Sequence, residues 1–262
     1  MLQLLKIEWL KLRHYRTFWI LGSLYLVSLV AINYIGFSIE QRTIAKEQML
    51  KAMVGTSFGY PNVWQTVGWL SSFLVFIPAL LIITLVANEF SYKTHRQNII
   101  DGWSRMEFVS VKIAMTLLIS LVSTGMVLLT VLLIGSLGEA AYSAEGIEYL
   151  GYYFIQTFSY CSFALLLAVL LKRTGLALGI FLAYGIALEN IVGNMISWMT
   201  RSPAGNYLPL NSTDSLIPFP FAKNITRQFM ENYSVSWLLV FAGIYLALYL
   251  FLSIRRMQKA DL

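Results

Sequence analysis

The chain has 262 residues, of which 58% are hydrophobic and only 12% are charged. Soluble domains carry about 25% charged residues, so the composition excludes an ordinary soluble domain and indicates a membrane protein. A net charge of +6 would suggest a nucleic-acid partner in a soluble protein. Here the lysines and arginines flank apolar segments, which membrane topology explains better, so no nucleic-acid partner is expected.

The first 17 residues are basic and amphipathic. Their apolar stripe, at helical intervals of three and four, consists of Leu2, Leu5, Trp9 and Leu12. Most of the lysines and arginines of this segment fall off the stripe. Such a helix is expected to lie in the headgroup plane of a membrane, with its basic side chains facing anionic lipid.

Six apolar segments are long enough to cross a membrane. They lie at about 18–37, 69–87, 108–134, 150–171, 175–195 and 235–254. Pro78 lies inside the second segment and is expected to kink it, which membrane helices tolerate. The expected fold is therefore all-α, with six transmembrane helices forming a single membrane-embedded domain over residues 1–262.

The distribution of basic residues predicts the orientation. Thirteen of the 19 lysines and arginines lie in the two terminal segments and in the loops after the second and fourth expected spans. The other six lie in the loops after the first and fifth spans. Because cytoplasmic loops carry the excess of basic residues, both termini are expected in the cytoplasm, which requires an even number of spans.

The segment between the second and third expected spans, residues 88–107, is charged and polar and is expected to be cytoplasmic. Residues 88–100 contain neither glycine nor proline and predict a short helix, which Gly102 would end. Ser104 and Glu107 then match a capping box at the start of the third span.

This segment also carries a pattern found in a known family. The pattern consists of Glu89, Thr94-His95-Arg96-Gln97, Gly102, Ser104-Arg105 and Lys112. It resembles the first cytoplasmic loop of the type-2 membrane permeases of ATP-binding-cassette (ABC) transporters. In that family the loop forms a coupling helix that docks in a groove on the ATPase subunit. The resemblance implies that the docking contact or its support comes from Glu89, Thr94, Arg96, Gln97, Gly102 and Arg105.

The sequence contains no Walker A pattern, G-x-x-x-x-G-K-[ST], so ATP hydrolysis is expected on a separate ATPase subunit, which would hold ATP and magnesium. The resemblance implies a permease subunit that is not an enzyme and binds no cofactor. It also implies a bacterial plasma-membrane exporter, dimeric with itself or with a similar permease. One alternative is an ion-coupled carrier or channel that uses Glu189, and another is an intramembrane enzyme.

Glu189 is the only acidic residue inside an expected span, and an ionisable group at that depth indicates a functional site. Other polar residues that could line the outer part of a pathway with it are Gln156, Ser159, Asn190 and Asn194. The other interpretation is a helix end at the outer headgroups, where Glu189 would be hydrated.

The fifth expected span carries a stripe of small residues, which let membrane helices approach closely. It consists of Gly175, Gly179, Ala183 and Ala187. Packing at a subunit or cavity-lining interface and ordinary packing within one bundle both remain open. His14, His95 and Cys161 have no partners at ligand spacing, so no metal site is expected.

Overall fold

The computed structural model describes residues 2–44, 57–92, 94, 104–138, 140–221 and 233–258. Within these ranges the secondary structure is entirely helical, which confirms the all-α class. Five of the helices are long and apolar enough to cross a membrane, and a sixth crossing is added if one bent helix pair counts as a single span. These are the helices of an integral membrane protein.

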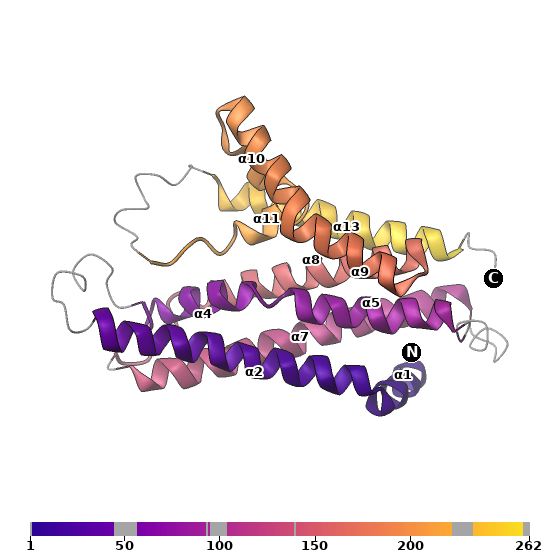
Figure 1. The fold of residues 1–262 in the computed structure, drawn as a ribbon, viewed down its shortest axis with the longest axis horizontal. Helices are drawn as coiled ribbons and strands as arrows, with labels where there is room; N and C mark the ends of the chain where they lie inside the picture. The colour runs from indigo at the N-terminus through magenta and orange to yellow at the C-terminus, as the bar shows by residue number, and fades with distance from the viewer. Residues whose placement is uncertain are drawn as a thin grey trace.

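The helices follow one another along the chain with these bounds: α1 Leu2–His14, α2 Arg16–Ile39, η1 Glu40–Ile44, α4 Val63–Ser72, α5 Phe76–Ser91, α7 Arg105–Leu137, α8 Glu148–Leu171, α9 Thr174–Leu182, η2 Ala183–Leu188, α10 Glu189–Thr200, η3 Pro203–Tyr207, α11 Asn211–Asp214 and α13 Val235–Gln258. The long helices run along an elongated bundle, and α10 projects from it at an angle (Figure 1).

Helix α8 forms the centre of the bundle. In its apolar window 67% of the residues are buried, against 33% or less in the other four long apolar helices. It packs against α4, α5, α7 and α13. Cys161, Ala164 and Ala168 are fully buried on it, and their small side chains permit close approach of the neighbouring helices.

The second expected span is a broken helix. α4 and α5 meet at an angle of 43° across residues 73–75, so the predicted kink is confirmed. Pro78 has no N–H to donate to the carbonyl of Leu74, and its ring clashes with that carbonyl, so a straight helix cannot pass through this point. The helical segment also starts at Val63, six residues before the expected boundary, because Val63, Trp64 and Val67 are buried in the bundle.

The expected start of α7 is confirmed at its cap. Ser104 Oγ accepts a hydrogen bond from the Glu107 N–H at 3.2 Å, and Glu107 Oε2 accepts one from the Ser104 N–H at 2.9 Å. This reciprocal pair satisfies two N–H groups that a helix start leaves unpaired. The helix therefore begins at Arg105, and it continues to Leu137.

After α10 the chain turns back onto the bundle. Arg201 adopts a left-handed conformation with φ 49° and ends α10, and η3 then packs against that helix. Gly193 and Gly205 lie at this crossing, where a Cβ on either residue would collide with the opposite segment. Leu216 and Ile217 follow α11 and are buried.

One end of the bundle gathers α1, the end of α5, the start of α7, the turn between α8 and α9 and the end of α13 (Figure 1). Residues 57–62 and the loop between α7 and α8 lie at the opposite end (Figure 1). The described part of the chain thus begins and ends on the same side of the bundle.

This arrangement and the basic-residue distribution predict which sites are accessible from each face of the membrane. In a Cys161→Ala background, we expect Thr94→Cys to react with a membrane-impermeant maleimide only after the membrane is permeabilised, so that the reagent reaches the cytoplasm. Ala144→Cys, in the loop between α7 and α8, should react on intact cells. Both positions are exposed, so accessibility within the protein does not limit either reaction. Labelling of Thr94→Cys on intact cells would contradict the orientation.

Candidate functional site

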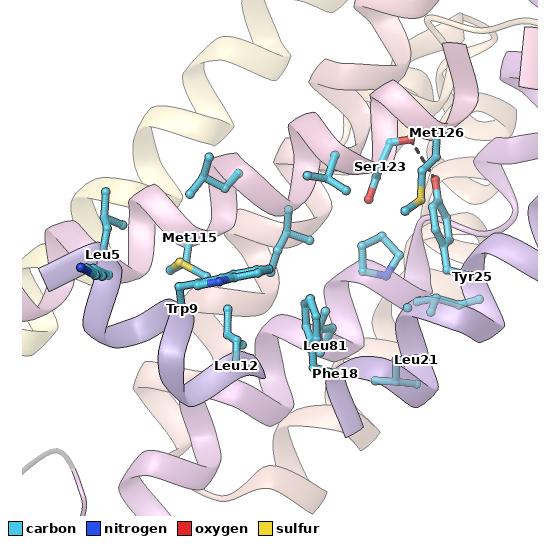
Figure 2. Close-up of a pocket in the computed structure, with 17 residues that line it drawn as sticks. Leu5, Trp9, Leu12, Phe18, Leu21, Tyr25, Leu81, Met115, Ser123 and Met126 are labelled. Carbon is cyan, nitrogen blue, oxygen red and sulfur yellow. Dashed lines mark hydrogen bonds between the residues drawn. The ribbon is translucent and has the colours of Figure 1, made fainter. Parts of the chain in front are cut away.

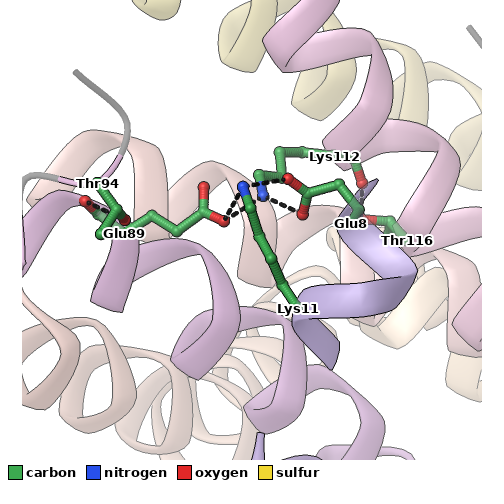
Figure 3. Close-up of polar contacts among 6 residues, drawn as sticks. All are labelled: Glu8, Lys11, Glu89, Thr94, Lys112 and Thr116. Carbon is green, nitrogen blue, oxygen red and sulfur yellow. Dashed lines mark hydrogen bonds and ion pairs between the residues drawn. The ribbon is translucent and has the colours of Figure 1, made fainter. Parts of the chain in front are cut away.

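Four charged side chains meet at the α1 end of the bundle, and we call them the Lys112 cluster (Figure 3). Lys112 Nζ on α7 donates to Glu8 Oε2 on α1 at 2.6 Å and to Glu89 Oε1 on α5 at 2.7 Å. Lys11 Nζ donates to Glu8 Oε1 at 2.9 Å and lies 3.8 Å from Glu89 Oε1. Two carboxylates and two ammonium groups therefore join three helices.

The Lys112–Glu8 pair is buried, with side-chain exposures of 5% and 6%. The Lys112 ammonium also lies 5.1 Å from the centre of the Phe108 ring, in cation–π contact. Burial by itself raises the pKa of the Glu8 carboxyl. The charge of Lys112 and the hydrogen bonds from Lys112 and Lys11 outweigh burial and lower that pKa below its ordinary value of 4.5.

Asn88, the neighbour of Glu89, makes a second set of links. Its Nδ2 donates to the hydroxyl oxygen of Tyr15, which lies at the bend between α1 and α2. Its Oδ1 accepts a hydrogen bond from Thr174 Oγ1, at the first residue of α9, at 2.8 Å. The last full turn of α5 is thus tied to α1, α2, α7 and α9 through two consecutive residues.

The residues expected to couple to an ATPase fall into two groups. Three of them are described. Glu89 belongs to the Lys112 cluster, and Thr94 is exposed. Arg105 Nη1 donates to the carbonyl of Gln258, at the end of α13, at 2.8 Å. The Thr94 hydroxyl donates to the Glu89 carbonyl at 3.4 Å. The remaining residues of this set, Arg96, Gln97 and Gly102, lie outside the described residues, as does most of the expected short helix.

An apolar groove lies beside the cluster, between α1, α2, α5 and α7, and has a volume of about 460 Å³ (Figure 2). Leu5, Trp9 and Leu12 of the N-terminal stripe line it, together with Met115 of α7. Leu5 and Leu12 pack against Met115, whereas Trp9 stays half exposed. Leu5 and Leu12 of the α1 stripe thus pack against the helix bundle, and Trp9 remains partly exposed on the surface.

A second cavity, of about 340 Å³, lies between α4, α5, α8, η2, α10 and α11. We call it the Asp214 cavity. Gln156 Nε2 and the Tyr160 hydroxyl each donate to the Asp214 carboxylate at 2.8 Å. Ser72 Oγ donates to Gln156 Oε1 at 2.8 Å, which orients the amide nitrogen toward Asp214. Asn190 also lines the cavity.

The structure thus brings two of the five pathway candidates, Gln156 and Asn190, to one cavity. Ser159 is buried elsewhere on α8, and Asn194 is exposed. Glu189 is buried and does not line the Asp214 cavity. Its Oε1 accepts hydrogen bonds from the backbone N–H groups of Leu210 and Asn211 at 2.6 and 2.9 Å, so it holds the returning chain against α10.

The small-residue stripe is exposed along its whole length, at Gly175, Gly179, Ala183 and Ala187. An added Cβ at Gly175 or Gly179 would meet nothing within 4 Å. Helix packing within the described part of the chain therefore does not use this stripe. Across the same ranges, no group of three or more His, Cys, Asp or Glu side chains is placed to hold a metal ion.

Among the residues of these sites that sequence reasoning missed are the carboxylates Glu8 and Asp214 and the amide Asn88. A signal for Glu8 was present, because it is the only acidic residue before Glu40 and falls at helical spacing from Leu5 on the apolar stripe. A carboxylate in an apolar stripe needs a buried partner. Asn88 and Asp214 carry no comparable local signal.

A family model for a protein of unknown function (DUF2705) matches residues 24–262. The chain belongs to the DUF2705 family. The part shared with DUF2705 starts within α2, so it includes Glu89, Lys112 and the whole Asp214 cavity, and it excludes Glu8 and Lys11 of α1. A comparison with curated proteins finds none that matches this DUF2705 chain.

The Lys112 cluster predicts a large loss of stability when its central cation is removed. We expect Lys112→Met to lower the free energy of unfolding by about 3–5 kcal/mol, because it removes the buried cation that pairs with Glu8 and Glu89 and leaves both carboxylates largely buried. The measurement is the thermal unfolding midpoint of the purified DUF2705 protein in detergent.

The matched control is Lys6→Met, which removes an exposed lysine from α1 and should leave the midpoint nearly unchanged. The triple variant Glu8→Gln, Glu89→Gln, Lys112→Met should recover much of the stability lost in Lys112→Met, because no unpaired buried charge remains. Equal midpoints for Lys112→Met and Lys6→Met would refute the structural role of the cluster.

The lowered pKa of Glu8 predicts a pH-dependent contribution to stability. The folded protein binds fewer protons at Glu8 than the unfolded chain, so the stabilisation is fully present above pH 4.5 and is lost as the pH falls through the lowered folded pKa. The midpoint difference between wild type and Glu8→Gln should therefore shrink as acidity increases below pH 4.5. A difference independent of pH in this range would contradict the assignment.

Proposed function

We propose that this chain is the membrane-spanning subunit of an ATP-driven transporter, and that a separate ATPase subunit moves it through the loop between α5 and α7. The observation that carries the proposal is the Lys112 cluster, which ties the helices on both sides of that loop to each other and to α1. The proposal places six spans in a bacterial plasma membrane, with both termini in the cytoplasm.

A loop that receives force must be attached to elements that move together. Glu89 lies within the last turn of α5 and Lys112 in the third turn of α7, and their 2.7 Å contact closes the base of the loop. Asn88 extends the attachment to the bend at Tyr15 and to the start of α9 at Thr174. Displacement of the loop would therefore move several helices as one unit.

Two residues of the ABC-permease pattern, Glu89 and Lys112, are distant in sequence and paired in the structure. This pairing supports the resemblance, since a pattern with a common mechanical role should converge in space. With no Walker A pattern in the sequence, ATP and magnesium are assigned to the partner subunit. Arg96, Gln97 and the exposed Thr94 are proposed to contact that partner, with Glu89, Gly102 and Arg105 as support.

The proposed assembly contains two permease subunits, either identical or similar. The exposed stripe from Gly175 to Ala187 supports a second helix packing there, because small residues allow backbones to approach closely and the chain's own described helices leave the stripe uncovered. The proposed direction is export, as the resemblance to the ABC permeases implies.

An ion-coupled carrier or channel that uses Glu189 is the competing function. It requires a carboxylate that faces a pathway and can bind or release an ion. Glu189 instead accepts two backbone hydrogen bonds, from Leu210 and Asn211, and does not line the Asp214 cavity. This position is better suited to fixing the returning chain than to ion coupling.

The proposal predicts a physical and functional partner. We expect the chain, purified from its native membrane in mild detergent, to carry a nucleotide-binding ATPase whose hydrolysis depends on the membrane subunit. The double variant Arg96→Ala, Gln97→Ala should weaken docking about tenfold or more, because each lost polar contact contributes on the order of 1 kcal/mol. ATP hydrolysis by the complex in liposomes should fall accordingly.

The control is Arg201→Ala, which removes an exposed arginine at the end of α10, away from the docking loop. It should leave ATP hydrolysis unchanged. Wild-type hydrolysis in the Arg96→Ala, Gln97→Ala variant, with normal membrane insertion, would count against docking at this loop. Purification without any ATPase would count against the whole proposal.

A further inference from the structure

The Asp214 cavity contains a carboxylate with no cationic partner among the described residues. Each Asp214 oxygen accepts one hydrogen bond, from Gln156 or from Tyr160, and both donors are neutral. No ion pair between described residues involves Asp214 or the nearby Glu189. Two carboxyl groups therefore lie in this region with only neutral hydrogen-bond donors among the described residues.

The rest of the cavity wall suits an organic cation. Trp69, Phe73 and Phe76 also line it, and the Phe76 and Tyr160 rings meet edge to face with centres 5.4 Å apart. Aromatic faces attract ammonium and similar cations, and the attraction is stronger where water is excluded. The volume of about 340 Å³ falls within the range of small-molecule sites.

A metal ion fits this wall less well than an organic cation. Hard metal ions need several oxygen ligands, and the cavity offers one carboxylate, with the amide oxygen of Gln156 already accepting a hydrogen bond from Ser72. The aromatic residues would contribute no ligands. A bulky cation with apolar substituents could contact both the Asp214 carboxylate and the aromatic side chains.

We propose that the Asp214 cavity binds an amphipathic organic cation, with its charge facing Asp214 and its apolar groups against Trp69, Phe73 and Phe76. Asn190 lies on the wall contributed by α10 and can contact the same ligand. The claim that this ligand is the transported cargo rests on the proposed function. The claim that the cavity binds an organic cation does not depend on it.

The test uses tetraphenylphosphonium and tetraphenylborate, which have nearly the same size and shape and opposite charge. Equilibrium dialysis of the purified full chain in detergent, corrected for binding to protein-free micelles, measures the affinity for each ion. We expect saturable binding of tetraphenylphosphonium alone. Asp214→Asn should weaken that binding about tenfold or more, because it removes the charge and keeps the shape.

A pair of variants tests the site even where Asp214→Asn fails to fold. Asn190→Asp adds a carboxylate to the exposed part of the cavity lining and should tighten tetraphenylphosphonium binding several-fold. Asn194→Asp adds the same charge one turn along α10, at an exposed position that does not line the cavity, and should leave the affinity near that of wild type.

The proposal is overturned if wild type shows no saturable binding, if both ions bind equally, or if Asn190→Asp and Asn194→Asp have the same affinity. None of these measurements involves ATP or a partner subunit. Loss of the cation site with an intact ATPase complex would therefore reject this inference alone. Cation binding without any ATPase partner would reject the transporter proposal alone.

Discussion

Burial of charge at the end of α5 is the constraint on which this structure depends. Lys112 and Glu8 lie almost entirely out of solvent, where an isolated ion is strongly disfavoured. Each is tolerated only because α1, α5 and α7 meet at this point and supply opposite charges at 2.6–2.9 Å. The position of α1 is therefore fixed by electrostatics as well as by the packing of Leu12 on Val111 and Met115.

The features that could be predicted from sequence are those determined within a few residues. The capping box of Ser104 and Glu107 is read from neighbours three residues apart, and the break before Pro78 follows from one missing N–H. The Lys112–Glu8 pair joins residues separated by 104 positions, and the Asp214–Gln156 bond joins residues separated by 58. Such contacts depend on how the helices pack, which local pattern does not determine.

The two groups of polar residues differ in how their charges are balanced. In the Lys112 cluster two carboxylates face two ammonium groups, so the negative and positive charges within the cluster are equal in number. In the Asp214 cavity the described residues offer the carboxylate only neutral donors, from Gln156 and Tyr160. The first arrangement suits a permanent joint between helices, and the second suits a site that is completed by a molecule from outside.

The broken helix formed by α4 and α5 connects these two regions. The C-terminal end of α5 carries Asn88 and Glu89, whereas Ser72 at the end of α4 and Phe76 at the start of α5 border the Asp214 cavity. Residues 73–75 interrupt the helix between these two regions, so α4 and α5 could change their relative angle at this point. Phe73 lies within this break and Phe76 directly after it, and both line the Asp214 cavity, so a change in the angle between α4 and α5 would alter the shape of the cavity.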